Sequence, residues 1–299
     1  MADLSVSDAS TWRQLWDETA DVVGDRTQAR WLCEEASGLE GSDFMDALDE
    51  PATVRMGLSL QSMVGRLLVG EPLQYVLGHW PFRRVDLMVD PRVLIPRPET
   101  ELVAEVALHL ARGVHGELAG TASLLVADLG TGSGAIGLAL ASELPISGVE
   151  VWITDLSEDA LDVARANIAG IGRNAANVRV AQGSWCDALP SQHRGAFHVI
   201  VSNPPYIAHD DAEIDDAVRN WEPAAALFAA DMGMSDIVTV AGQARDWLAD
   251  GGWLVLEIGH RQAENVRGVL NNLGYGDVEI RPDLAQRDRI AIARRMNAN

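Results

Sequence analysis

The first part of the chain carries apolar residues at helical spacing. Trp12, Leu15 and Trp16 follow the i, i+3, i+4 pattern that places side chains on one face of a helix. The same kind of pattern predicts two further helices, over about residues 27–37 and 53–69, and a glycine follows each of them. The N-terminal part of the chain is therefore expected to form a small bundle of helices.

The pattern changes beyond residue 100, where short apolar runs alternate with helical periodicity. Such alternation predicts an α/β fold, in which helices cover both faces of a mostly parallel sheet. The runs that we expect to be strands cover residues 124–129, 149–154, 178–181, 198–201, 253–258, 278–281 and 289–293. Helices are expected over residues 99–110, 135–144, 158–169, 235–248 and 262–273.

A third kind of sequence separates these two regions. Residues 84–89 alternate as a strand does, and prolines at positions 91, 96 and 98 then interrupt regular structure. We interpret this stretch as a linker hairpin between two domains. The expected division is residues 1–75 for the helical domain, 76–100 for the linker hairpin and 101–299 for the α/β domain.

A glycine-rich segment lies between the first strand of the α/β region and the helix that follows. Glycines let the chain turn sharply and let a ligand approach the backbone closely. The free N–H groups and the positive dipole at the start of the helix favour an anionic ligand group. Dinucleotides and S-adenosylmethionine (SAM) are both bound by such loops, and a literal dinucleotide pattern ends at Gly137. The segment consists of Gly130, Thr131, Gly132, Ser133 and Gly134.

Two carboxylates favour SAM at this loop. The phrase that begins at Asp128 resembles the first motif of class I SAM methyltransferases, and Asp128 would bind the ammonium group of SAM or order the loop. Asp155 ends the next predicted strand, where a carboxylate can accept hydrogen bonds from the two ribose hydroxyls. The alternative for Asp155 is to cap the helix that follows it.

The most informative segment follows the strand predicted over residues 198–201. Two consecutive prolines, Pro204 and Pro205, fix the backbone and remove two N–H donors, so that the loop is stiff. The side-chain oxygen of Asn203 and the carbonyl of Pro204 can each accept one N–H, and Tyr206 adds a flat, partly polar wall. This set suits a planar nitrogen that carries two hydrogens.

The predicted reaction is methylation of such a nitrogen. Two hydrogen bonds would turn its lone pair out of conjugation and towards the methyl group of SAM, and positioning alone can lower a barrier by about 7–11 kcal/mol. No strong base is needed, because the nitrogen becomes acidic once it carries the methyl group. Both the N6 group of adenine and the amide of glutamine present such a nitrogen, so the motif leaves the substrate open.

Charge and composition argue against several functions and kinds of site. The 299 residues include 23 basic and 44 acidic ones, for a formal net charge of −21, which argues against a surface that grips nucleic acid. No apolar run is long enough to span a membrane. The two cysteines, Cys33 and Cys186, cannot form a disulfide framework, and the histidines show no metal-ligand spacing. We therefore expect a cytoplasmic protein that has no metal site and does not bind a membrane.

Further phrases make the chain similar to the HemK/PrmC family, the peptide chain release factor N5-glutamine methyltransferases. The resemblance covers nearly the whole chain. Besides the two motifs above, it is carried by Gly70–Tyr75 followed by Gly78, Leu94–Glu101, Glu222–Leu227 followed by Asp231 and Gly233, Leu254–Gly259, and Asp283–Arg289.

The resemblance implies a fold and a cofactor. The fold is that of class I SAM methyltransferases (Rossmann-like), with a mostly parallel seven-stranded sheet and a small N-terminal helical bundle for substrate recognition. The SAM loop falls on Gly130–Gly134 and the ribose-binding acid on Asp155. Trp185 would pack on the adenine, whereas Ser184 stands where the family commonly has an aspartate, so the acid that would accept from the adenine amino group is absent.

The resemblance also implies a substrate. Asn203 would contact both SAM and the substrate amide, and Pro204, Pro205 and Tyr206 would complete the substrate pocket. The family substrate is the glutamine of the Gly-Gly-Gln loop in release factors, which becomes N5-methylglutamine. The first 75 residues contain 14 acidic residues and 5 arginines, which suits a protein partner that presents cations around that loop.

Several alternatives stay open at this point. Within the family, the substrate could be a glutamine of a ribosomal protein. An adenine-N6 methyltransferase of nucleic acids would need a basic face and a base-flipping pocket, and an NAD-dependent oxidoreductase rests on the glycine pattern alone. Arg97 and Glu99 either line the cofactor cleft or pack the linker against the α/β domain. We expect a monomer, because no interface pattern stands out, and no direct binding of nucleic acid.

Overall fold

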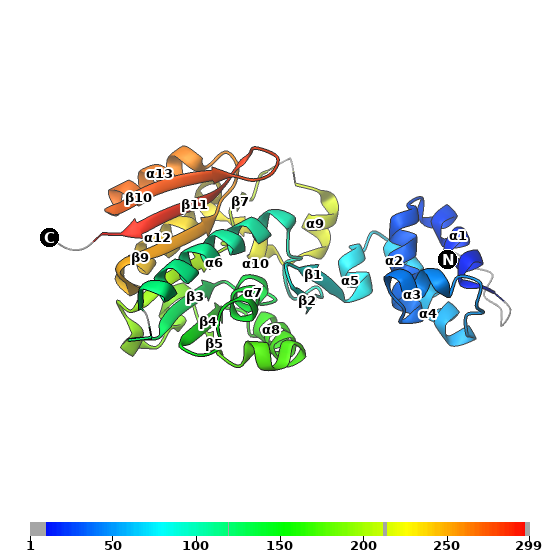
Figure 1. Ribbon diagram of the computed structural model, residues 1–299. Helices are drawn as coiled ribbons and strands as arrows, with labels where there is room; N and C mark the ends of the chain where they lie inside the picture. Colours follow the sequence, from blue (N-terminus) through cyan, green and yellow to red (C-terminus); the bar gives the residue numbers. More distant parts are fainter. Residues whose placement is uncertain (1–9, 119, 212–213, 297–299) are drawn as a thin grey trace. The chain divides into compact units, whose positions relative to one another are not determined.

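The chain folds into two compact units. The computed structural model describes residues 10–118, 120–211 and 214–296. Described residues of the first unit lie within Met1–His79 and Asp216–Trp221, and those of the second within Trp80–Asp215 and Glu222–Asn299 (Figure 1). The domain boundaries expected at residues 75 and 100 stay a prediction. Within the described ranges, no helix combines the length and the apolar character needed to cross a membrane.

The first unit is helical. Thr11 begins the first helix with a capping box, in which its hydroxyl accepts from the Gln14 N–H and the Gln14 side chain accepts from the Thr11 N–H. Phe44 and Leu60 are fully buried in its core. The three predicted helices are confirmed, and α3 and α5 are additions too short for periodicity to indicate. The helices are α1 (Trp12–Val23), α2 (Arg26–Ser37), α3 (Gly41–Asp46), α4 (Val54–Leu68), α5 (Leu73–Leu77) and α9 (Asp216–Trp221).

The expected hairpin is present as β1 (His79–Phe82) and β2 (Val85–Met88). Asn167, a buried residue of α8 (Glu158–Ile171), connects β2 to the glycine-rich segment. Its Oδ1 accepts from the Met88 N–H at 2.7 Å, and its Nδ2 donates to the carbonyls of Met88 at 3.1 Å and Ser133 at 2.8 Å. A single amide side chain thus fixes the hairpin beside the loop that we expect to bind SAM.

The second unit contains a seven-stranded sheet in the order β10-β11-β9-β6-β3-β4-β5. The pairs formed by β3, β4, β5, β6 and β9 are parallel, and β11 is antiparallel to both of its neighbours. The prediction of a mostly parallel seven-stranded sheet is therefore confirmed. The strands are β3 (Leu124–Leu129), β4 (Val149–Asp155), β5 (Val178–Gln182), β6 (Phe197–Ser202), β9 (Leu248–Glu257), β10 (Tyr275–Pro282) and β11 (Asp288–Arg295).

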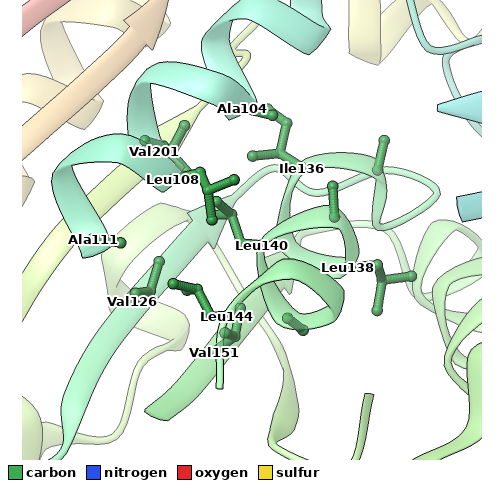
Figure 2. Close-up of a cluster of buried hydrophobic side chains, with 14 of the residues drawn as sticks. Ala104, Leu108, Ala111, Val126, Ile136, Leu138, Leu140, Leu144, Val151 and Val201 are labelled. Carbon is green, nitrogen blue, oxygen red and sulfur yellow. The ribbon is translucent and has the colours of Figure 1, made fainter. Parts of the chain in front are cut away.

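Alternate residues of each strand point to opposite faces of this sheet. Both faces are apolar, and helices cover both of them. Val199 and Val201 of β6 join the buried cluster that contains α6 (Pro98–Leu118), α7 (Ala135–Glu143) and α8. Ile200, between them, joins the cluster that contains α12 (Ser235–Trp247) and α13 (Ala263–Asn272). Figure 2 shows the first cluster, where Leu108 of α6 and Ile136 and Leu140 of α7 meet the strands.

The remaining elements are short and connect the larger ones. β7 and β8 form a two-stranded parallel sheet after the Asn-Pro-Pro-Tyr segment. The sequence does not predict this sheet, because each of its strands has only two residues. These elements are η1 (Gly172–Ala175), η2 (Trp185–Ala188), η3 (Ser191–His193), β7 (Ile207–Ala208), α10 (Ala224–Leu227), β8 (Phe228–Ala229) and α11 (Ala230–Gly233).

Candidate active site

A cavity of about 560 Å³ lies at the carboxyl ends of the parallel strands in the second unit. This is the edge at which open α/β sheets bind their ligands. The cavity is bordered by loops that follow β3, β4, β5 and β6, by the proline-rich segment before α6, and by the start of α12. Its lining includes Gly130, Thr131, Gly132, Ser133, Asp155, Trp185, Asn203 and Pro205, which are all residues expected in the site.

The glycine-rich segment turns sharply from β3 into α7. Gly130, Gly132 and Gly134 have positive φ angles of 68°, 56° and 90°, which other residues rarely adopt. At Gly130 a side chain would also collide with its surroundings, because a Cβ there would lie 2.9 Å from Cζ3 of Trp185. Gly130, Gly132 and Gly134 are therefore favoured by their backbone conformation. Gly130 is needed in addition because Trp185 packs against it.

Asp128 orders this loop. The carboxylate is buried, and its Oδ2 accepts hydrogen bonds from the Thr131 hydroxyl and, at 2.8 Å, from the Gly137 N–H at the start of α7. Burial raises the pKa of Asp128 from its usual 3.8 to about 6, against the hydrogen bonds, which favour the charged form. Of the two roles considered for Asp128, the structure shows the ordering of the loop, although the residue also borders the cavity.

Asp155 connects the end of β4 to the same loop. Its Oδ2 accepts from the Gly132 N–H and its Oδ1 from the Ser157 N–H, both at 2.9 Å. The helix N-cap is Ser157, whose hydroxyl accepts from the Ala160 N–H, so the capping alternative for Asp155 is wrong. Burial raises the pKa of Asp155. The carboxylate borders the cavity, where ribose binding stays a prediction.

Trp185 provides an aromatic wall on this side of the cavity. It begins η2 with a positive φ of 48°, an uncommon conformation for a bulky residue, and its ring lies against Gly130. Ser184, the residue without a carboxylate, also lines the cavity. Asp236 from the first turn of α12 lines it too, and burial raises the pKa of this carboxyl. No motif around Asp236 indicated this position.

The Asn-Pro-Pro-Tyr segment enters the cavity from β6. Asn203 and Pro205 line the cavity, and the Nδ2 of Asn203 lies 3.5 Å from the Thr100 hydroxyl, to which it donates. Among the described residues, Pro204 and Tyr206 lie outside the lining. The Tyr206 hydroxyl instead donates to Oε1 of Glu257 at 3.0 Å, and burial raises its pKa far above the usual value.

Sequence reasoning missed Glu257 as a site residue. It is the last residue of β9 and is fully buried, at the end of an apolar run. Its Oε2 accepts from the Thr100 hydroxyl at 2.7 Å. Because the contacts join residues 157 positions apart, no local motif could have indicated them.

The proline-rich segment is packed by an ion pair between the half-buried Arg97 and the buried Glu222. Arg97 donates to Oε1 of Glu222, whose Oε2 accepts from the Ile95 N–H at 3.1 Å. Arg97 and Glu99 lie outside the lining of the cavity as far as the described residues define it. The second alternative for Arg97 is therefore supported, since it packs the linker against the α/β unit.

No group of three or more His, Cys, Asp or Glu side chains that could hold a metal ion is found in the described part of the chain. The carboxylates of the cavity instead accept hydrogen bonds from backbone N–H groups and hydroxyls. Such a site suits an organic ligand with several donors.

The chain is similar to known proteins over most of its length. The family model "PrmC N-terminal domain" matches residues 18–78, and the model "Methyltransferase small domain" matches residues 116–241. A release factor glutamine methyltransferase of Bordetella pertussis is 39% identical over 277 residues, which cover 93% of this chain and 97% of the relative. A protein of the same name from Vibrio cholerae is 41% identical over 234 residues, which cover 78% and 77%.

Among solved structures, a methyltransferase from Pyrococcus furiosus has a TM-score of 0.51 at 19% identity, and the match covers 79% of this chain and 100% of that chain. This likeness supports the fold alone. The resemblance found in the sequence is confirmed by relatives that are similar over most of their own length. The chain belongs to the family of release factor glutamine methyltransferases.

Proposed function

We propose that this protein transfers the methyl group of SAM to the side-chain amide nitrogen of a glutamine in a release factor. One observation carries the proposal: a single cavity borders both the glycine-rich segment with Asp155 and the amide of Asn203. A methyl donor and a planar nitrogen could therefore meet in it. The names of the relatives indicate the same activity for those proteins.

The residues of the cavity fit SAM. The start of α7 offers free N–H groups for a carboxylate, and nothing lies within 4 Å of the place that a Cβ of Gly132 would occupy, so a ligand can approach the backbone there. Asp155 can accept from two hydroxyls, and Trp185 offers a flat surface for an aromatic base. When bound, SAM supplies a methyl group on a positively charged sulfur, which makes the methyl group electrophilic.

The protein contributes positioning at the substrate nitrogen. The Asn203 oxygen, at the cavity wall, is the acceptor proposed for one of its hydrogens. The second proposed acceptor is the carbonyl of Pro204, which lies outside the lining but directly follows Asn203 in a stiff Pro-Pro segment. The nitrogen is strongly acidic directly after it receives the methyl group. Its extra proton can therefore pass to solvent. Charged carboxylates near the cavity favour the positive charge that the nitrogen carries at that stage.

The proposed substrate is the glutamine of the Gly-Gly-Gln loop. We also propose that the acidic helical unit attracts a partner that presents cations, since complementary charge speeds encounter. A cytoplasmic location and a monomeric state accompany this proposal as predictions from the sequence. The formal net charge of −21 favours a protein amide over an adenine in nucleic acid.

The test is to incubate the protein with labelled SAM and a release factor, then to examine the Gly-Gly-Gln peptide by mass spectrometry. The expected result is one added methyl group on the glutamine side chain. A release factor with alanine in place of that glutamine is the matched control and should take up no label. Label in a ribosomal protein or in nucleic acid, with none in the release factor, would contradict the proposal.

A further inference from the structure

A chain of buried hydrogen bonds lies behind Asn203. Strands β6 and β9 are paired so that Ser202 lies opposite Leu256, which brings the next residues, Asn203 and Glu257, to the same edge of the sheet. Glu257 is fully buried, and Thr100 on α6 is 3% exposed. The Thr100 hydroxyl donates to Glu257 at 2.7 Å and accepts from Nδ2 of Asn203 at 3.5 Å.

The carboxylate of Glu257, at the end of this chain of hydrogen bonds, determines which group donates and which accepts at each step. In its ionised form Glu257 can only accept hydrogen bonds, so the single proton of the Thr100 hydroxyl then points to Glu257. The Thr100 oxygen can then only accept from Asn203, and it selects the NH₂ end of that amide. The oxygen of the Asn203 amide is therefore turned away from Thr100.

We propose that Glu257 and Thr100 are positioning residues, which hold the Asn203 amide with its oxygen directed to the substrate nitrogen. The proposal rests on the proposed function, because it concerns how the same amide acts. With the opposite orientation, the NH₂ group of Asn203 would face the N–H groups of the substrate, and two donors would meet without an acceptor.

Glu257 acts on Tyr206 in the same way. The Tyr206 hydroxyl uses its proton for Glu257 at 3.0 Å and accepts from Nη1 of Arg289 at 3.3 Å. Arg289 also donates to the carbonyl of Ile258 at 3.1 Å, and it is 7% exposed. One carboxylate thus sets the hydrogen-bond directions on both sides of the Asn-Pro-Pro-Tyr segment.

A purely structural purpose does not account for this carboxylate. Its neighbours in the chain, Leu256 and Ile258, are buried apolar residues. Burial of a carboxylate is costly, and burial raises the pKa of Glu257 accordingly. An apolar side chain of similar volume often stabilises a core as well or better. A carboxylate at this place is explained by the direction that it gives to Thr100 and Tyr206.

The kinetic test compares four variants. T100V removes the hydroxyl at nearly constant shape, and E257Q replaces an obligatory acceptor by an amide that can also donate. T100S keeps the hydroxyl. T154V is the matched control, because Thr154 is buried in β4 and its hydroxyl has no hydrogen-bond partner among the described residues.

We expect T100V and E257Q to lower kcat for the release factor by about 10- to 100-fold, with unchanged SAM affinity by calorimetry. T100S and T154V should keep kcat near that of the unmodified protein. A native kcat in T100V, or a loss in T100S as large as that in T100V, would overturn the proposal. An unmodified protein that methylates no release factor would contradict the proposed function instead.

A second measurement does not depend on activity. With selective ¹⁵N-asparagine labelling, the side-chain NH₂ protons of Asn203 should show a nuclear Overhauser effect to the methyl group of Thr100 in the unmodified protein. This effect requires the NH₂ end of the amide to face Thr100. Its absence, with the Asn203 signals assigned, would overturn the positioning proposal even if the protein proves to be fully active.

Discussion

The two sides of the cavity are built in different ways. On the cofactor side, backbone N–H groups of the glycine-rich segment and the start of α7 donate to Asp128 and Asp155. On the substrate side, the contacts join side chains: Asn203 to Thr100, and both Thr100 and Tyr206 to Glu257. The first side therefore depends on the path of the backbone, and the second on where distant elements place side chains.

This difference has a consequence for how each side responds to mutation. A backbone loop shifts as a whole, so a change there is expected to weaken ligand binding and stability together. A chain of side-chain hydrogen bonds determines orientation, so a change there is expected to affect the rate of transfer more than binding.

The largest effect is expected for Asn203→Ala on the substrate side. The variant loses the amide oxygen that we propose orients the substrate nitrogen, and we expect methyl transfer to fall by about 10³-fold or more. SAM binding should persist, and the melting temperature should change little because Asn203 is half-buried at the cavity wall. Single-turnover kinetics and calorimetry measure the two effects. Full turnover in this variant would contradict the mechanism.

On the cofactor side, Asp128→Asn should change how stability depends on pH. The pKa of Asp128 is about 6 in the folded protein, above its usual 3.8, so between these values the folded protein keeps a proton that the unfolded chain has released. The unfolding free energy should therefore fall as pH rises through this range, by about 3 kcal/mol from this group.

Asparagine at position 128 keeps an oxygen that can accept from Thr131 and Gly137 but does not titrate. Urea unfolding of both proteins at several pH values between 4 and 7 gives the comparison. The unfolding free energy of the variant minus that of the unmodified protein should rise with pH and level off above about pH 6, because only the unmodified protein loses stability from this group. A constant difference would show that Asp128 is not the group responsible.

Asp155→Ala tests the other carboxylate of the cofactor side. It should weaken SAM binding by about 10- to 100-fold, because the acceptor that we propose for the two ribose hydroxyls is lost together with two contacts to the backbone. At saturating SAM, kcat should stay close to that of the unmodified protein. Calorimetry measures the affinity, and an unchanged affinity would argue against ribose binding at this residue.

The smallest effect is expected from a pair of alanine substitutions in the glycine-rich segment. Gly130→Ala and Gly132→Ala both place a side chain at a positive φ, which costs about 1 kcal/mol. At Gly130 the new Cβ would also displace Trp185, whereas at Gly132 nothing lies within 4 Å. We expect Gly130→Ala to weaken SAM binding about tenfold more than Gly132→Ala, which is the matched control. Equal affinities would show that the position of Trp185 is unimportant for binding.

Much of the fold follows from the sequence. The strand predicted over residues 124–129 is confirmed as β3, and the helix predicted over residues 135–144 as α7, because periodicity and glycine punctuation coincide there. Helix α6 continues to Leu118, well beyond the predicted end at residue 110, since its last turns pack apolar residues against the sheet. β9 begins five residues before the predicted strand, at Leu248, and contains a glycine pair that hides its start.

The residues of the site also fall into two groups, those that a local motif predicts and those that only long-range contacts bring together. Gly130–Gly134, Asp155 and Asn203 were predicted because each lies in or beside a continuous motif. All of them line the cavity except Gly134, which lies outside the lining as far as the described residues define it. Glu257 and Thr100 were not predicted, because a glutamate at the end of an apolar strand and a threonine in a first helical turn have many other uses. Their importance appears once β9, α6 and β6 meet.

The alternation of strands and helices, the glycine-rich turn and the stiff Asn-Pro-Pro-Tyr segment follow from the sequence alone, because they depend on local backbone preferences and on the pattern of apolar residues. The direction in which the Asn203 amide is held follows from the packing of the folded chain. That choice depends on a buried carboxylate 54 positions further along the chain and on a hydroxyl 103 positions before it. Hydrogen-bond direction is a property of groups in contact, and contact between distant residues arises only when the sheet and its helices pack together.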